Sequence, residues 1–131
     1  MTRFVIDPGV ALHLAQERAI LMPEHQLLAP ALIRSQLLSQ LYAKVRRGEL
    51  ERAEADRRLD YVRGLRLRLL GDRVLQRVAW DLATELDLAD TASAEYLALT
   101  RLQGDAFVTD DPALAGIARR VVAVATEADL T

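Results

Sequence analysis

The sequence contains no cysteine, which excludes a disulfide framework and any metal site built from thiolates. It also lacks an uncharged apolar run that approaches the roughly 18 residues needed for a membrane-spanning helix. The first twenty residues carry Asp7, His13 and Glu17, which is not typical of a signal peptide. We therefore expect a soluble, cytoplasmic protein with no membrane partner.

Glycine-rich phosphate-binding loops are missing too. No Gly-x-Gly-x-x-Gly or Walker-type pattern occurs, and the only lysine, Lys44, falls in an expected helix. A receiver domain or a haloacid-type phosphatase would also place an aspartate after the first strand. The phosphatase needs a second aspartate two residues later, where Gly9 stands. These absences disfavour an α/β domain that binds nucleotides or transfers phosphate.

The chain of 131 residues is 51% hydrophobic, which suits one domain with a sizeable core. Its net charge of −2 is unevenly distributed. Between Lys44 and Arg77 there are eleven basic and six acidic residues, whereas the remainder has six basic and thirteen acidic residues. Such a basic stretch suits a phosphate backbone or an acidic partner, but it also suits a solvated helical hairpin. Both interpretations stay open.

Hydrophobic periodicity predicts strands that alternate with helices. This alternation is typical of an α/β fold, here a three-layer α/β/α sandwich with a central parallel sheet of about four to five strands. We expect a single domain over residues 1–131, with a basic helical hairpin at about 31–63. The expected strands are 4–6, 26–29, 106–109 and 121–125, with an edge strand or extended connection at 65–70. The expected helices start near 8, 31, 49, 72, 91 and 112.

An aspartate followed by proline occurs twice, each time between an expected strand and an expected helix. The two motifs are Asp7-Pro8 and Asp110-Asp111-Pro112. Proline suits the first position of a helix and aspartate suits the N-cap, so capping alone can explain each motif. Parallel strands end at the same edge of a sheet, however, and two such acids can meet there. Together they would offer carboxylate oxygens to Mg²⁺ or Mn²⁺.

Four short motifs follow one another along the chain. They are Val5-Ile6-Asp7, Ala29-Pro30 before a helix, Tyr96-Leu97-Ala98-Leu99 and Val108-Thr109-Asp110-Asp111. In order and spacing they resemble a PIN domain, and most closely the small VapC-like toxins of bacterial toxin–antitoxin pairs. The resemblance spans residues 4–124. It implies a ribonuclease that uses Mg²⁺ or Mn²⁺ to hydrolyse phosphodiesters, with RNA, an antitoxin protein and a second copy of the chain as partners.

The resemblance also implies four acidic positions around the metal. Asp7 and Asp111 match two of them and are the expected catalytic and metal-binding residues. Thr109 matches the family's hydroxyl residue, and its neighbour Asp110 is expected to support the site. The other two positions hold Gln36 and Ser93, which carry no charge.

Uncharged side chains at two of four positions weaken the expected site, because hard cations are held largely by carboxylate charge. Asp90 precedes Ser93 by three residues and can either lie on the same helix face as a replacement ligand or cap that helix. We therefore expect metal-dependent hydrolysis to be weakened or lost. The alternative is a non-catalytic module that binds RNA or an antitoxin and needs no cofactor.

The remaining conspicuous side chains have no obvious role in chemistry. Neither His13 nor His25 has a nucleophile nearby in sequence, so we expect neither to be catalytic. The only tryptophan, Trp80, is expected to be a packing residue.

Overall fold

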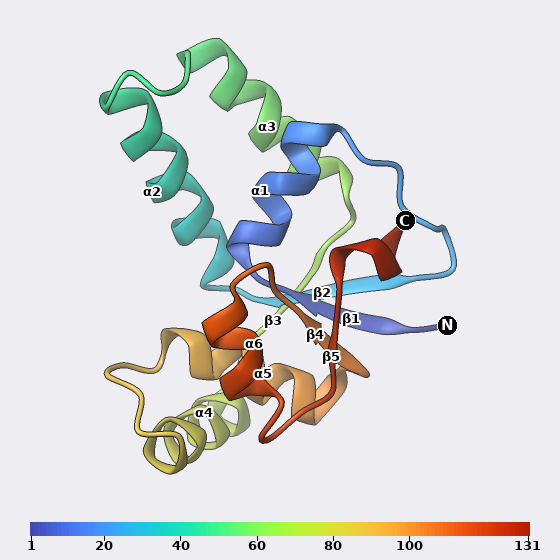
Figure 1. The fold of residues 1–131 in the computed structure, drawn as a ribbon, viewed down its shortest axis with the longest axis vertical. Helices are drawn as coiled ribbons and strands as arrows, with labels where there is room; N and C mark the ends of the chain where they lie inside the picture. The colour runs from blue at the N-terminus through green and yellow to red at the C-terminus, as the bar shows by residue number, and fades with distance from the viewer.

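The strands of this protein form one parallel sheet in the order β3-β2-β1-β4-β5 (Figure 1). The computed structural model describes residues 1–131. It contains β1 (Arg3–Ile6), α1 (Pro8–Glu17), β2 (Gln26–Pro30), α2 (Ile33–Arg46), α3 (Arg52–Gly64), β3 (Arg68–Leu70), α4 (Arg73–Glu85), α5 (Ala92–Gln103), β4 (Ala106–Val108), α6 (Pro112–Ala118), β5 (Val124–Ala125) and a 3-10 helix (Glu127–Leu130). The predicted α/β class and parallel sheet are confirmed.

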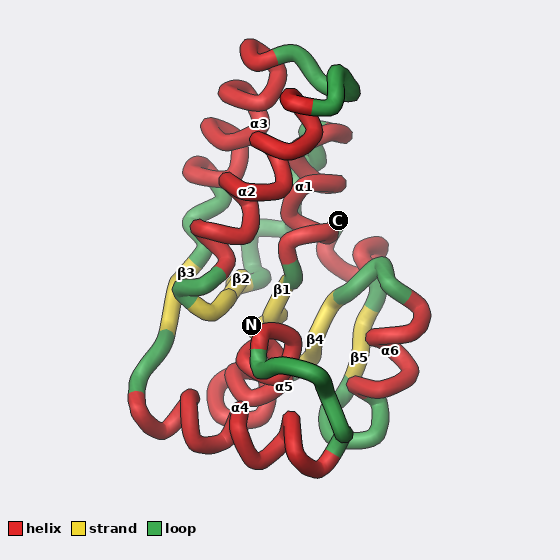
Figure 2. The backbone as a smooth tube through the Cα atoms, turned by 90° about the vertical axis from the view of Figure 1, so that its left-hand side faces the viewer, coloured by secondary structure: helices red, strands yellow, loops and turns green.

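Helices cover both faces of the sheet. Helices α1, α2 and α3 pack against one another on one face, and α5 packs against β1, β2 and β4 on the other (Figures 1 and 2). Helix α4 packs against α5 as the outermost element of that layer. The result is the predicted three-layer sandwich. None of its helices is both long and apolar enough to cross a membrane.

The first strand of the chain lies at the centre of the sheet. Its residues Phe4, Val5 and Ile6 are all buried, as expected for a parallel strand that is covered on both faces. Val5 lies opposite Leu28 of β2 on one side and opposite Phe107 of β4 on the other. The core is therefore built around β1, and the residue that follows this strand lies near the middle of the sheet's carboxyl edge.

Aspartates cap three of the helices, two of them at the Asp-Pro motifs of the sequence. Asp7, Asp72 and Asp111 each accept a hydrogen bond of 2.9 Å from an amide in the first turn of α1, α4 and α6, respectively. Pro8 and Pro112 occupy the first helical positions, where a missing N–H costs nothing. Both Asp-Pro motifs therefore mark the start of a helix, and this capping role is compatible with a further role in metal binding.

The predicted basic hairpin is present as α2 and α3, but its charge is partly neutralised. Arginines of α3 pair with carboxylates three or four residues away, and Ala55 is the only fully buried residue of this helix. Exposed pairs of this kind contribute little to stability. This part of the basic stretch is a solvated helix, whereas Arg34, Arg66 and Arg68 have no carboxylate partner.

Two expectations are wrong in detail. Trp80 is 69% exposed, because α4 turns Leu75, Ala79 and Leu82 towards the core and leaves Trp80 on its outer side. The last strand starts only at Val124, since the preceding valines belong to a turn that bonds back to the end of α6. The 3-10 helix that follows was not predicted.

Candidate functional site

The ends of β1 and β4 bring the two Asp-Pro motifs together. These strands are parallel neighbours with Ile6 opposite Val108, so Asp7 and Thr109 are the first residues beyond the sheet on adjacent strands. The amide of Asp7 donates to the carbonyl of Val108 at 3.4 Å. Side chains from opposite ends of the sequence thus converge at one edge of the sheet, where the topology predicts them.

Asp7 is a buried carboxylate whose two oxygens are both hydrogen-bonded. Oδ1 accepts from the amide of Val10 at 2.9 Å, and Oδ2 accepts from the hydroxyl of Thr109 at 2.6 Å. Burial raises the pKa of Asp7, and although these hydrogen bonds oppose the rise, the nearby charges of Asp110 and Asp111 add to it. The fold therefore maintains a carboxylate at a position that is unfavourable for its charge.

Thr109 connects Asp7 to Asp111. Its hydroxyl oxygen accepts from the amide of Asp111 at 3.2 Å while its proton is donated to Asp7. Asp111 is exposed, and its Oδ1 accepts from the amide of Ala113 at 2.9 Å. Its Oδ2 accepts no hydrogen bond from the protein, so this oxygen is available to a ligand.

The uncharged position Gln36 is also tied to this region. The hydroxyl of the buried Tyr96 donates to Oε1 of Gln36 at 2.5 Å. The pKa of Tyr96 is raised by burial and, to a lesser extent, by the charges of Asp7 and Glu95. Gln36 is therefore hydrogen-bonded to a tyrosine that is close enough to Asp7 for the charge of Asp7 to raise its pKa. Ser93 lies one turn before Tyr96 on α5 and is half-buried.

Asp90 caps the start of α5. Its Oδ1 accepts from the amide of Ala92 at 3.0 Å, and the side chain is exposed. The N-cap residue Thr91 makes no side-chain hydrogen bond, which leaves the capping to Asp90. The capping interpretation holds, and a role for Asp90 as a metal ligand stays a prediction.

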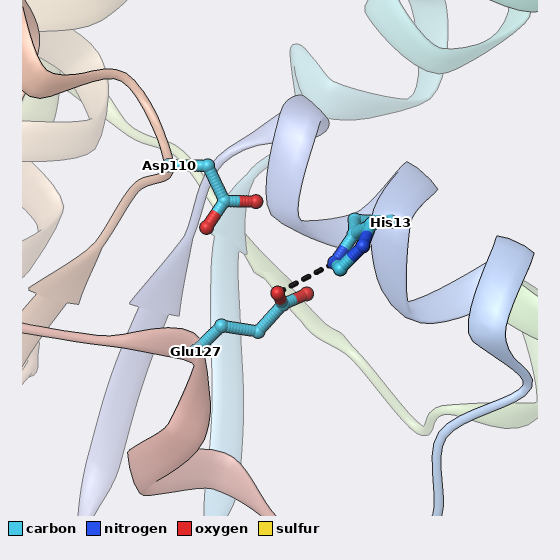
Figure 3. Close-up of side chains that lie close together, drawn as sticks. All are labelled: His13, Asp110 and Glu127. Atoms are coloured by element: carbon cyan, nitrogen blue, oxygen red, sulfur yellow. Dashed lines mark hydrogen bonds and ion pairs between the residues drawn. The ribbon is translucent and has the colours of Figure 1, made fainter.

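A second cluster at the same edge was not foreseen. His13 of α1, Asp110 of the turn after β4 and Glu127 of the 3-10 helix point towards one another (Figure 3). One donor atom from each lies within 4.8 Å of the others. Nδ1 of His13 is 2.6 Å from Oε2 of Glu127, and this hydrogen bond raises the pKa of His13. The group has the composition of a metal site.

Part of this cluster was accessible to sequence reasoning. Glu127 follows β5 by two residues, so the rule that singled out Asp7 and Asp111 as acids beyond strand ends applies to it equally. His13 carries no such signal. It lies in the middle of α1, and its partner Glu127 is 114 residues away.

Comparison with known proteins supports the fold. No protein-family model and no curated protein matches this chain. A crystal structure of PAE2754 from Pyrobaculum aerophilum is similar, with a TM-score of 0.79 and 20% sequence identity over 98% of this chain and 91% of that one. At this level of identity the likeness shows that the two chains share a fold. What the site does must be argued from its own residues.

Proposed function

We propose that this protein is a PIN-like ribonuclease of the toxin–antitoxin type, with weakened hydrolysis of phosphodiesters that depends on Mg²⁺ or Mn²⁺. One observation carries the proposal: Asp7 and Asp111, which follow β1 and β4, meet at the carboxyl edge of the sheet and are linked through Thr109. Asp7 is buried and ionisable, and such groups in folded proteins cluster at functional sites. A cap alone does not require a buried carboxylate.

The residues present fit one hard cation better than two. Asp111 has an unpartnered carboxylate oxygen, and each oxygen of Asp7 keeps a lone pair beyond the hydrogen bond it already accepts. Two ions about 4 Å apart need several carboxylates to balance their charge. Gln36 and Ser93 are uncharged, so they do not provide for a second ion. Asp7 and Asp111 would hold a single Mg²⁺ or Mn²⁺, with water filling the other positions.

The bound cation supplies a water of lowered pKa and charge stabilisation at the phosphate. The chain's own contribution is to hold the donors still. Thr109 and the amide of Val10 each bond one oxygen of Asp7, so both bonds restrain rotation of its carboxylate. Gln36 is fixed by Tyr96 and presents a neutral amide where a carboxylate is expected from the resemblance. The missing charge is the physical reason for weak activity.

An arginine-lined hollow offers a place for the RNA backbone. It has a volume of about 240 Å³ and lies between the start of α2 and the end of α3. Arg34, Arg63 and Arg66 line it, and only Arg63 has a carboxylate partner, Asp60. Guanidinium groups bind phosphate oxygens well, so this hollow supports RNA as the substrate.

The alternative is a non-catalytic module that binds RNA or an antitoxin. Two observations favour it: Oε1 of Gln36 is already used by Tyr96, and α2 exposes Leu38 and Tyr42 at 60% and 63%. Large apolar side chains side by side on a surface helix suit a protein partner, either an antitoxin or a second copy of the chain.

Two measurements test the proposal. The first is Mn²⁺ binding by calorimetry on the parent protein and on Asp7→Asn, and the second is cleavage of a mixed RNA substrate in the presence of Mn²⁺. We expect Asp7→Asn to lose both. The matched control is Asp81→Asn. Asp81 is an exposed residue of α4 that belongs to neither strand-end motif, so its replacement should change neither Mn²⁺ binding nor cleavage.

A charge-restoring variant separates the two interpretations. Gln36→Glu combined with Ser93→Asp should raise Mn²⁺ affinity and cleavage if the site is a weakened nuclease. If the parent does not cleave RNA and the double variant does, the natural protein is the non-catalytic module. If neither protein binds Mn²⁺ or cleaves RNA, the nuclease proposal is wrong.

A further inference from the structure

We propose that His13, Asp110 and Glu127 form a binding site for one divalent transition-metal ion, separate from the site at Asp7 and Asp111. The inference does not rest on the proposed nuclease function. It rests on three side chains that come from three different elements and converge on a common point (Figure 3). No short sequence motif contains them, so only the fold brings them together.

The spacing of the donor atoms suits a metal ion. The three atoms lie within 4.8 Å of one another. Ligands at about 2.0–2.2 Å from a metal are about 3 to 3.5 Å from each other. The cluster therefore needs only side-chain adjustments, in which Asp110 moves inwards and the 2.6 Å contact between Nδ1 of His13 and Oε2 of Glu127 lengthens. Asp110 is exposed on a turn and has no hydrogen-bond partner that would resist this movement.

Glu127 is the best-fixed member of the cluster and is incompletely satisfied. Its Oε1 is buried and has no hydrogen-bond partner, which is uncommon for a carboxylate oxygen because leaving it unpaired costs free energy. The 3-10 helix that carries it is secured by a capping box between Thr126 and Asp129 and by the buried Leu130. The other oxygen, Oε2, already contacts His13, so a cation bound there would offset the charge of a carboxylate that is incompletely hydrogen-bonded.

The donor set favours borderline metals over magnesium. A neutral imidazole suits Zn²⁺, Co²⁺, Ni²⁺ and Fe²⁺, whereas Mg²⁺ prefers sites made only of oxygen. Two carboxylates also balance the charge of one divalent ion. The second ring nitrogen of His13, Nε2, lies 3.8 Å from Oε1 of Glu17, an electrostatic contact that is too long for a hydrogen bond. The two neighbouring sites therefore differ in chemistry, with oxygen donors at Asp7 and mixed donors at His13.

Co²⁺ is the probe of choice, because its visible absorption bands report inner-sphere coordination directly. The untagged, chelator-treated full chain is titrated with Co²⁺, and Zn²⁺ is then added as a competitor. In millimolar Mg²⁺, which competes for the oxygen donors at Asp7 and Asp111, we expect one Co²⁺ per chain to stay bound until Zn²⁺ displaces it. His13→Gln and Glu127→Gln should each weaken Co²⁺ binding at least tenfold.

Two controls separate this site from its surroundings. Asp7→Asn removes the main carboxylate of the neighbouring site, and His25→Gln removes the only other histidine. In millimolar Mg²⁺, which occupies the neighbouring oxygen site, both variants should retain the single Co²⁺ that the parent binds. Far-UV circular dichroism establishes that each variant is folded, and the exposure of the His13 side chain, 48%, makes its replacement structurally mild.

Four results would overturn the proposal. The parent could show no saturable Co²⁺ spectrum, the spectrum could persist in folded His13→Gln, or it could vanish in folded His25→Gln. Loss of Co²⁺ binding in Asp7→Asn but not in His13→Gln would also overturn it, because the ion would then occupy the Asp7 site. That last outcome supports the proposed function, so the two proposals fail independently.

Discussion

The hydroxyl of Thr109 donates a 2.6 Å hydrogen bond to Oδ2 of Asp7, a residue 102 positions earlier in the chain. Both side chains are buried, so the bond joins the ends of β1 and β4 away from solvent. It also determines how the acidic edge of the sheet is arranged, since the same hydroxyl oxygen accepts from the amide of Asp111.

Replacing Thr109 with valine keeps the shape of the side chain and removes this bond. A hydrogen bond to a buried charged group contributes about 1.5–3 kcal/mol, so we expect Thr109→Val to lower the free energy of unfolding by about 2 kcal/mol. Urea denaturation at neutral pH measures the change. Thr84→Val is the control, because the hydroxyl of Thr84 is exposed and bonds only within its own helix. Equal losses in the two variants would contradict the prediction.

The raised pKa of Asp7 has a consequence for pH dependence. Because the pKa of Asp7 is higher in the folded state than in the unfolded state, its protonated form favours folding. This contribution to stability is fully present below the unfolded-state pKa of 3.8 and is lost as the pH rises through the folded-state pKa. Asp7→Asn retains the N-cap and removes the charge. We expect the variant to gain stability relative to the parent as pH increases above about 3.8. Thermal unfolding over a pH series measures this difference, and a difference that shrinks with rising pH would refute the assignment.

The pKa of His13 should be measurably raised by Glu127. In the metal-free protein, NMR titration should place it above 6.5, the ordinary value for histidine, because the imidazolium donates to a carboxylate at 2.6 Å. Glu127→Gln should lower the pKa of His13 again. The two histidine signals are assigned with His25→Gln. An unchanged His13 titration in Glu127→Gln would show that the pair does not form in solution.

Tyr96→Phe tests whether the bond to Gln36 contributes to stability. Removing the hydroxyl leaves the half-buried Oε1 of Gln36 without its donor, and we expect a loss of about 1 kcal/mol in the free energy of unfolding. Tyr42→Phe is the matched control. Its hydroxyl is on a side chain that is 63% exposed, and it has no partner in the protein. Chemical denaturation of both variants gives the comparison, and a neutral Tyr96→Phe would mean that water replaces the hydroxyl readily.

Gly104 allows the end of α5 to approach β1 closely. A methyl group at this position would lie 2.9 Å from Cγ2 of Val5 and 3.2 Å from Cα of Thr100. Overpacking of this kind costs about 1–3 kcal/mol, and we expect Gly104→Ala to be destabilised by that amount. Gly116→Ala in α6 has nothing within 4 Å and should instead gain about 0.5–1 kcal/mol. Melting temperatures that move in the same direction in both variants would contradict this account.

Local sequence signals located most elements of this fold. The Asp7-Pro8 and Asp111-Pro112 pairs fix where strands end and helices begin, because proline restricts the backbone and aspartate caps it. The sequence indicated that these two strands belong to one parallel sheet and can meet there, whereas their direct pairing is given by the structure.

Other features depend on contacts that no local pattern encodes. The exposure of Trp80 depends on which side of α4 meets α5, and both sides of that helix carry apolar residues. The pairing of His13 with Glu127 arises from packing between the first helix and the last turn of the chain. The bond from Tyr96 to Gln36 likewise spans 60 residues, so its existence required the structure.

The central position of β1 also bears on how the molecule is made. This strand is synthesised about a hundred residues before its partner β4, which is about 5–20 s at ordinary translation rates. Until then one edge of β1 stays open and its apolar side chains are partly uncovered. The acidic edge of the sheet cannot exist in any nascent chain that lacks β4. A protein that cleaved RNA at this edge would therefore stay inert until β4 had been synthesised and had paired with β1.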